Sequence, residues 1–281
     1  MAKNLVSGLE VFNKSRFNDK LRDFGAAGLS SVHFVLDFDY TLTTLFTADG
    51  DRASSSWGVL ERHLPPAAQK ECQDMHDYYV VKERAGTLTI DEAETWWAKA
   101  LAVQRDNQVN LMEVEANFMY QANIRPGTHE LFDELNTHAI PSIILSAGIK
   151  NVIDIWCAAY KISPSLVVST ELTTDKKGRM TGWNTNSVIH ALNKDEADHP
   201  EMSQLKEGRP YTILLGDSIH DAQMAAGDDT VIRIRIVDTQ PDTDMVEVAG
   251  ITSQAFDAMI TNTDLLPVVA LLQRIKSLQT K

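Results

Sequence analysis

The sequence predicts an α/β fold: a doubly wound parallel sheet in a Rossmann-like core, with an inserted helical cap. Short apolar runs that are too brief for helices recur along the chain, and polar residues bound each of them. Segments with apolar residues at helical spacing separate most of these runs, which is typical of right-handed βαβ units. One long stretch after the first run shows only helical patterns, and it predicts the cap.

The composition indicates a folded protein and disfavours several functional classes. The chain has 281 residues, of which 43% are hydrophobic, and its net charge is −13. This acidic balance argues against binding to nucleic acid polymers or acidic membranes. Cys72 and Cys157 have no metal-ligand spacing, and no stretch approaches the roughly 20 apolar residues of a membrane span. With no signal peptide pattern at the amino terminus, we expect a cytoplasmic protein.

The first apolar run lies in residues 32–41 (VHFVLDFDYT) and ends in Asp37 and Asp39. A parallel strand here would deliver both carboxylates to the sheet edge where ligands bind in α/β proteins. Two like charges this close are unfavourable unless a cation or a proton is shared between them. The pair therefore indicates a metal site, although Asp37 by itself is also compatible with an aspartate that caps a turn.

Residues 48–123 are expected to form the cap, and residues 1–47 and 124–281 the core. In the cap, Pro65-Pro66 opens one helix that ends near residues 78–81. Thr89 and Glu92 form a capping-box pattern that begins a second helix, which carries Trp96 and Trp97. A third helix covers about residues 109–121. The breaker cluster at residues 125–127 (RPG) is suited to a hinge back into the core.

The second half of the chain returns to alternating helices and strands. Four further strands are predicted at residues 141–145, 166–168, 211–215 and 231–237, and a fifth at residues 256–260. Helices are predicted at residues 128–136, 149–156, 217–226 and 265–278. The turn signal at residues 175–178 (DKKG) predicts a small hairpin that closes near residues 180–183.

Residues that could take part in catalysis or ligand binding follow three of these strands. Besides Asp37 and Asp39, these are Ser146 with Ala147 and Gly148, and Gly216 with Asp217 and Asp221. The carboxyl ends of parallel strands share one edge of the sheet, so we expect the groups to converge. Asp217 and Asp221 are expected one turn apart on one helix face, and their carboxylates are the oxygen ligands that Mg²⁺ prefers.

Two residues in this region are suited to binding an anion. Ser146 offers a hydroxyl and nearby backbone N–H groups at a strand-to-helix turn, and Lys194 offers a positive charge beside the acidic cluster. Taken singly, each has an ordinary alternative, since serine often caps a helix and a lone lysine is usually solvated. Asp217 and Asp221 are likewise compatible with a helix cap and a surface acid.

The ordered set of DFDYT, LSAG, NK and GDSIHD resembles the four motifs of the haloacid dehalogenase superfamily of phosphotransferases. The resemblance implies that Asp37 is a nucleophile and Asp39 a general acid and base. It also implies that Asp37, Asp39, Asp217 and Asp221 serve a Mg²⁺ site, and that Ser146, the Ala147 N–H and Lys194 bind phosphate. An aspartate at position 39 favours a phosphatase over the dehalogenases and ATPases of the superfamily.

More narrowly, the chain is similar to the type III cytosolic 5′-nucleotidases, which hydrolyse pyrimidine and 7-methylguanosine monophosphates. The resemblance implies a nucleoside monophosphate substrate, possible phosphate transfer to a nucleoside, and a cap glutamate and aromatic ring that contact the base. Glu83 is the expected glutamate, with Lys82 as the alternative alignment, and Trp96 is the expected stacking ring, with Trp97 as its competitor. Tyr40 and Gln104 depart from the residues usual in this family, which leaves the base preference unpredicted. The oligomeric state does not follow from the sequence.

Two other functions are compatible with the same residues. A phosphatase of this fold can act on a phosphate ester that is not a nucleotide, and a binding module can retain the fold without activity. A panel of phosphate esters separates these possibilities, because only a nucleotidase prefers nucleotides, and a silent module releases no phosphate from any ester.

Overall fold

The centre of the computed structural model is a seven-stranded sheet, and the residues described are 6–47, 49–117, 123–185, 188–195, 197, 199–240 and 242–279. Its order is β1-β9-β8-β7-β2-β3-β4, and every pairing is parallel except that of β1 with β9. The strands are β1 (Glu10–Val11), β2 (Val32–Leu36), β3 (Ser142–Ile149), β4 (Leu166–Thr170), β7 (Tyr211–Gly216), β8 (Val231–Ile236) and β9 (Ala258–Ile260).

The strand order confirms the predicted doubly wound sheet. The chain starts its parallel strands at β2, continues outward through β3 and β4, and then returns to β7 on the other side of β2. Ligands in open α/β sheets bind outside the carboxyl ends of the strands at such a reversal. The β2/β7 boundary is therefore the expected site position, and β2 ends immediately before Asp37.

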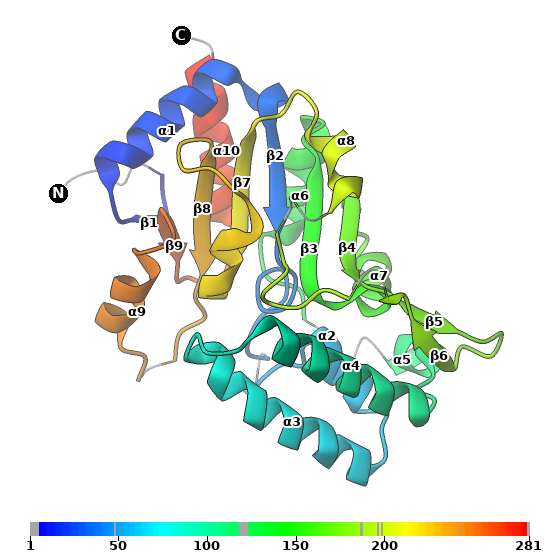
Figure 1. The fold of residues 1–281 in the computed structure, drawn as a ribbon. Helices are drawn as coiled ribbons and strands as arrows, with labels where there is room; N and C mark the ends of the chain where they lie inside the picture. Colours follow the sequence, from blue (N-terminus) through cyan, green and yellow to red (C-terminus); the bar gives the residue numbers. More distant parts are fainter. Residues whose placement is uncertain are drawn as a thin grey trace.

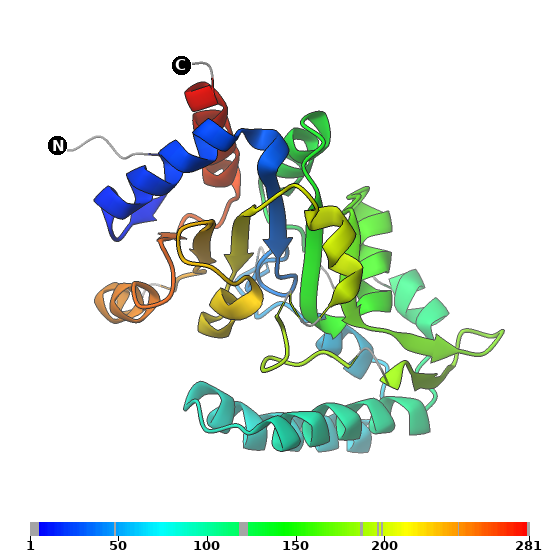
Figure 2. The same ribbon diagram turned by 45° about the horizontal axis from the view of Figure 1, so that its top comes forward.

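Helices cover both faces of this sheet (Figures 1 and 2). Phe34 and Leu36 of β2 face the larger core, and Val35 faces the smaller core on the opposite side. The larger core is covered by α1 (Lys14–Ala27), α6 (Thr128–Thr137), α7 (Lys150–Tyr160) and α10 (Leu266–Gln279). The smaller core is covered by short 3-10 and α-helical turns: η5 (Pro200–Met202), α8 (Ser203–Lys206) and η6 (Ile219–Met224). Because β2 is buried on both faces, its sequence is apolar except for His33, whose ring nitrogens form hydrogen bonds with Arg209 O and Thr212 Oγ1.

A helical insertion of residues 56–117 lies beyond the carboxyl ends of the strands (Figure 1). It contains α2 (Ser56–Glu61), α3 (Pro66–Arg84), α4 (Ile90–Asp106) and α5 (Leu111–Asn117), and α3 packs against α4. The predicted capping box is present, since the Thr89 hydroxyl and the Glu92 carboxylate each accept from the other residue's N–H. The boundaries of a separate cap domain stay a prediction.

The structure corrects several local predictions. Residues 49–55 are not helical, and a β-bridge joins Phe46 to Arg52. Strand β3 does not end at Ser146 but continues to Ile149, with an irregular register after Leu145. The helix after β7 is a 3-10 helix that begins after Ser218, so Asp217 lies outside it. Part of the predicted helix at residues 109–121 lies outside the described residues.

Some elements were not predicted at all. These include α1, the edge strand β1, the short helices η5 and α8, and helix α9 (Met245–Thr252), whereas the hairpin of β5 (Leu172–Thr174) and β6 (Met180–Trp183) was predicted. Phe17, Leu21 and Phe24 of α1 are buried at helical spacing, so the sequence does contain the signal for this helix. Within the described residues, no helix combines the length and apolar character needed to cross a membrane.

Candidate active site

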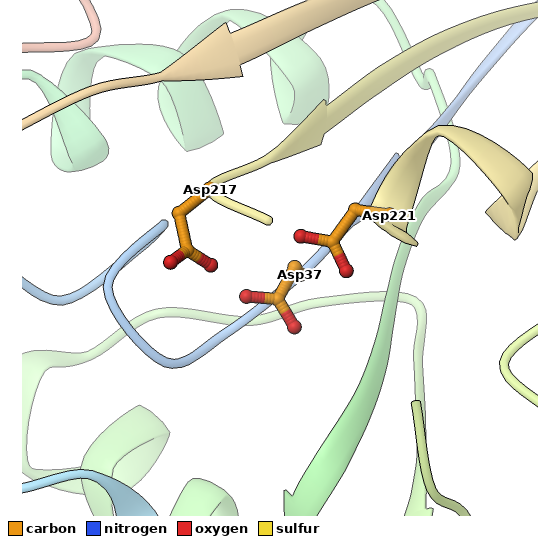
Figure 3. A group of neighbouring side chains, drawn as sticks. All are labelled: Asp37, Asp217 and Asp221. Atoms are coloured by element: carbon orange, nitrogen blue, oxygen red, sulfur yellow. The ribbon is translucent and has the colours of Figure 1, made fainter. Parts of the chain in front are cut away.

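Three carboxylates meet at the switch point of the sheet (Figure 3). Asp37 follows β2, while Asp217 and Asp221 follow β7, and one oxygen of each lies within 4.8 Å of the others. The predicted convergence of these residues is therefore present in the structure. Three acids this close repel one another, so the arrangement requires positive charge or protons.

The local geometry behind β7 explains how Asp221 joins the cluster. Ser218 caps the 3-10 helix and donates its N–H to Asp221 Oδ2 at 2.9 Å, which turns the carboxylate back toward the strand. Gly216 permits this approach, because a Cβ there would lie 2.3 Å from the Cβ of Asp221. Asp37 is fixed from the other side, since its N–H donates to Leu215 O at 2.9 Å.

Lys194 is the cation at the centre of the cluster. Its ammonium donates to Asp37 Oδ1 and, at 2.8 Å, to Asp221 Oδ1, and all three side chains are buried. Burial opposes the charge on Lys194, but the two carboxylates outweigh this and raise its pKa above the usual value. Lys194 is thus held charged, and it is an anchor of the acidic cluster rather than a solvated surface lysine.

One lysine does not neutralise all the carboxylates. Burial, together with repulsion from Asp221, raises the pKa of Asp37 to about 7 despite the opposing effect of Lys194. Burial and the neighbouring acids Asp221 and Asp37 also raise the pKa of Asp217 well above its usual range. A divalent cation would offset the repulsion between these carboxyl groups and favour their ionised, metal-binding form. The residues present are therefore suited to such an ion.

Asp39 is bound to the first residue of the helical insertion. The Ser56 N–H donates to Asp39 Oδ1 at 2.7 Å, and the Ser56 hydroxyl donates to Oδ2 at 2.6 Å. Ser56 Oγ in turn accepts from the Ile149 N–H at 3.2 Å. Burial raises the pKa of Asp39, and the two bonds from Ser56 oppose this shift. The first residue of the helical insertion is therefore hydrogen-bonded to a carboxylate of the site.

Ser146, Ala147 and Gly148 form the irregular end of β3. Ser146 is fully buried, and its Oγ accepts from the Gly148 N–H at 3.1 Å. Only glycine fits at position 148, since a Cβ would lie 2.2 Å from Ser56 Oγ and 3.0 Å from Asp39 Oδ2. This close approach brings the predicted phosphate-binding segment next to Asp39.

A small cavity in the helical insertion adjoins this segment. Its volume is about 150 Å³, and its walls are Ser55, Trp57, Glu61, Cys72, His76, Trp96, Trp97 and Ala100. Trp57 and Trp97 also donate hydrogen bonds to Ala147 O, so the cavity borders the predicted phosphate-binding segment. Glu61 places a carboxyl group among the three indole rings of the cavity, and burial raises the pKa of this group.

The predicted base-contacting residues occupy different positions. Trp96 lines the cavity and stacks on Tyr79 with ring centroids 5.4 Å apart, whereas its competitor Trp97 is nearly buried and bonded to Ala147 O. Glu83 lies near the end of α3 and is not among the cavity walls. Its alternative, Lys82, pairs with Glu92 and lies over the Tyr78 ring. The base-binding roles stay predictions.

Ser56, Trp57 and Glu61 were not predicted as site residues from the sequence. Three serines before an apolar segment at residues 57–60 are a signal for the start of a helix, and Ser55 does cap α2. Nothing in the local pattern indicates that this helix begins against Asp39. That contact depends on tertiary packing between segments far apart in the chain.

A buried arginine fixes the loop that follows Asp39. The Arg125 guanidinium donates to the carbonyl oxygens of Tyr40, Thr41 and Thr43 at 2.6, 2.7 and 3.0 Å. It also forms a bidentate pair with Asp238, with both distances 2.7 Å. Tyr40 has a left-handed backbone (φ 63°), which is unfavourable for a side chain of this size. Arg125 thus stabilises a strained turn next to the carboxylates.

Comparison with known proteins gives three findings. The model of the pyrimidine 5′-nucleotidase (UMPH-1) family matches residues 40–276, beginning directly after Asp39. A 7-methylguanosine phosphate-specific 5′-nucleotidase of Gallus gallus is 26% identical over 94% of both chains. The crystal structure of cytosolic 5′-nucleotidase IIIB bound to cytidine aligns with a TM-score of 0.82 and 24% identity, covering 98% of this chain and 96% of that one.

A more distant likeness concerns the fold alone. A substrate-bound phosphoserine phosphatase aligns with a TM-score of 0.57 and 15% identity over 85% of this chain and 96% of the other. The α/β fold class predicted from the sequence is therefore confirmed by structures of phosphatases as well as by the strand order.

Proposed function

Because the chain belongs to the pyrimidine 5′-nucleotidase (UMPH-1) family, we propose that it hydrolyses nucleoside 5′-monophosphates to nucleoside and phosphate. The observation that carries the proposal is the meeting of Asp37, Asp217 and Asp221 with Lys194 at the switch point. This cluster offers a nucleophilic carboxylate and a positive charge for phosphate at one position. Ser146 and the Ala147 N–H lie at the end of the neighbouring strand β3 and would bind the remaining phosphate oxygens.

The proposed chemistry has two displacements at phosphorus. In the first, a carboxylate oxygen of Asp37 attacks in line, and the bond to the ribose 5′-oxygen breaks while Asp39 gives that oxygen a proton. In the second, Asp39 takes a proton from water, whose oxygen attacks phosphorus and releases Asp37 and inorganic phosphate. A nucleoside hydroxyl in place of water would give phosphate transfer instead. Burial raises the pKa of Asp39, and a shift in this direction favours its role as a proton donor.

Mg²⁺ is the cation that the acidic cluster would hold. The Asp37 carboxylate, the Asp39 carbonyl oxygen and Asp217 would be its ligands, and Asp221 would support the site through its bond to Lys194. When bound, the ion neutralises phosphate charge and orients the group for displacement. Asp37 and Asp217 then ionise at lower pH, because added positive charge lowers the pKa of both carboxyl groups.

The effect of Mg²⁺ on thermal stability should grow with pH. At pH 5 the raised pKa of Asp37, about 7, keeps this group protonated, so the ion must displace its proton to bind. At pH 8 Asp37 has lost this proton in the folded protein, and its charge adds repulsion to the metal-free cluster that is absent at pH 5. We expect Mg²⁺ to raise Tm more at pH 8 than at pH 5. At pH 8, a Mg²⁺ concentration of 100 times Kd should add about 2.7 kcal/mol of stability.

Differential scanning calorimetry at both pH values, with and without Mg²⁺, measures this difference. The control is Asp217→Asn, which removes one proposed oxygen ligand and should weaken the Mg²⁺ response. An equal Mg²⁺ shift at both pH values, in the parent and in this variant, would contradict the assignment of the cluster as a metal site.

The cavity beside Ala147 is the proposed base site. Indole rings attract cations placed over their faces, and Glu61 adds a carboxyl group on the same wall. A 7-methylguanine base is cationic and planar, so it suits rings and a carboxylate better than an uncharged purine does. The name of the Gallus gallus relative supports the same substrate. We therefore propose a preference for 7-methylguanosine monophosphate over AMP and GMP.

A nucleotide panel with two matched variants tests this preference. Rates of phosphate release are compared for 7-methylguanosine monophosphate, UMP, CMP, AMP, GMP and base-free phenyl phosphate, in the parent and in Glu61→Gln and Glu83→Gln. If Glu61 contacts the base, Glu61→Gln should lower the preference for the methylated nucleotide over phenyl phosphate by roughly 10-fold, because a bond to a charged group is lost. If Glu83→Gln alone lowers it, the glutamate expected from the sequence contacts the base. A flat response to all esters would refute the nucleotidase proposal.

A further inference from the structure

Two tryptophans of the helical insertion converge on a single main-chain carbonyl of β3. The indole N–H of Trp57 donates to Ala147 O at 3.0 Å, and that of Trp97 donates to the same oxygen at 3.2 Å. Trp57 lies in the first turn of α2 and Trp97 in α4, so the two donors come from different helices. Their rings pack edge to face, with centroids 6.3 Å apart and planes at 89°.

This carbonyl belongs to the same peptide unit as the Gly148 N–H, which donates to Ser146 Oγ at 3.1 Å. A peptide unit is planar, so fixing its oxygen also fixes the direction of its N–H. With the Gly148 N–H on its acceptor side, the Ser146 hydroxyl keeps its own hydrogen for another acceptor. The two indoles are therefore linked to the Ser146 hydroxyl through one rigid group.

Hydrogen bonds in such a chain strengthen one another. An N–H bound to a carbonyl oxygen polarises the peptide unit and makes its own N–H a better donor. Here two indoles polarise the Ala147–Gly148 peptide, and burial of Ser146 and Trp97 keeps water from competing. The indole groups of the helical insertion thus strengthen the hydrogen bond that the Gly148 N–H donates at the end of β3.

We propose that Trp57 and Trp97 are positioning residues for phosphate: their N–H groups orient the Ala147–Gly148 peptide, which in turn orients the Ser146 hydroxyl toward the substrate. This proposal rests on the proposed function, in which Ser146 binds a phosphate oxygen. It assigns the indoles a role separate from base binding, since neither ring has to touch the phosphate. Seating of α2 and α4 on β3 would then complete the phosphate site.

The full-length enzyme with Mg²⁺ tests the proposal in the variants Trp57→Phe, Trp97→Phe and the double variant. Phenylalanine keeps an aromatic ring and removes the N–H. Each single variant should raise both the KM for phenyl phosphate and the inhibition constant of inorganic phosphate by roughly 3- to 10-fold, the loss of one hydrogen bond. The double variant should exceed the product of the two, because the second loss leaves the carbonyl without an indole donor.

Trp183→Phe is the matched control. Trp183 lies on the β5–β6 hairpin, where its ring packs against Arg105 of α4, away from Ala147. It should leave these constants unchanged. Amide hydrogen exchange gives a second readout that needs no activity: the Gly148 N–H should exchange faster in the single variants. Trp57→Phe is the safer variant for folding, because Trp57 is only partly buried.

Three outcomes decide the matter. Raised constants for phosphate and for the base-free ester, together with faster Gly148 exchange, support the positioning role. Raised KM for nucleotides alone, with the phosphate constant and Gly148 exchange unchanged, overturns it and leaves the rings to base binding. If the parent enzyme hydrolyses no ester, the proposed function fails, and the Gly148 exchange rates still decide whether the indoles fix this peptide.

Discussion

Replacing Asp37 by asparagine should lower nucleotide hydrolysis by about 10⁴-fold or more, because an amide cannot form the proposed aspartyl-phosphate. The substitution preserves the size of the side chain at a buried position and removes one of three crowded negative charges. The folded protein should therefore persist, with Lys194 still paired to Asp221. Phosphate release from the preferred nucleotide, measured with Mg²⁺ present, gives the result.

The control for this experiment is Asp154→Asn, which neutralises an exposed aspartate paired with Lys150 on α7. This variant should retain full activity, and both proteins should be checked by their Tm. Hydrolysis within 10-fold of the parent in a folded Asp37→Asn variant would show that Asp37 is not the nucleophile. A covalent phosphoryl group on Asp37 in the parent, trapped by acid quench, would support the proposed intermediate directly.

Replacing Lys194 by methionine should cause the second large effect, a loss of stability that depends on pH. At pH 8 the variant buries carboxylates without their ammonium partner, and breaking a buried pair in this way costs about 3–5 kcal/mol. At pH 5 the loss should be much smaller. Without Lys194 the pKa of Asp37 rises further above about 7, so at pH 5 this carboxyl group is protonated and carries no unpaired charge.

Urea unfolding of the metal-free protein at pH 5 and pH 8 measures both values. Lys150→Met is the matched control, because the Lys150–Asp154 pair is exposed and should contribute less than about 1 kcal/mol at either pH. A Lys194→Met variant that loses the same stability at both pH values would contradict the proposed state of the cluster. The variant should also hydrolyse nucleotides poorly, since it lacks the positive charge that is proposed to bind phosphate.

The core fold could be predicted from the sequence because the central parallel strands are mostly apolar. Residues 34–36 and 213–215 are continuous apolar runs, and the aspartates that follow them, Asp37 and Asp217, mark where each strand stops. The short edge strand β1 has no such pattern, since Glu10 is exposed and only Val11 packs on the core. Edge strands of two residues lack the length from which a period can be read.

The acidic cluster could be predicted from the sequence for a different reason. Parallel strands place their carboxyl ends on one edge, so Asp37, Asp217 and Asp221 were expected to meet, and they do. The reason given for the Asp217–Asp221 contact was wrong: a capping turn at Ser218 brings them together, not one face of an α-helix. The contacts of Ser56 and Trp57 depend on how the insertion sits over the sheet, which no local pattern encodes.

The Arg125–Asp238 pair has a consequence for how the molecule can be divided. Arg125 lies where the chain returns from the helical insertion, and it bonds to carbonyl oxygens of residues 40–43, where the chain departs toward it. Asp238 also accepts from the Leu45 N–H at 2.8 Å, so both connecting segments are fastened to the same point of the core. If the insertion moves relative to the core, the hinge points must lie after residue 45 and before residue 125, on the side of the insertion. An insertion exchanged between related proteins should therefore be cut beyond these two positions, leaving the turn that carries Asp37 and Asp39 with its own support.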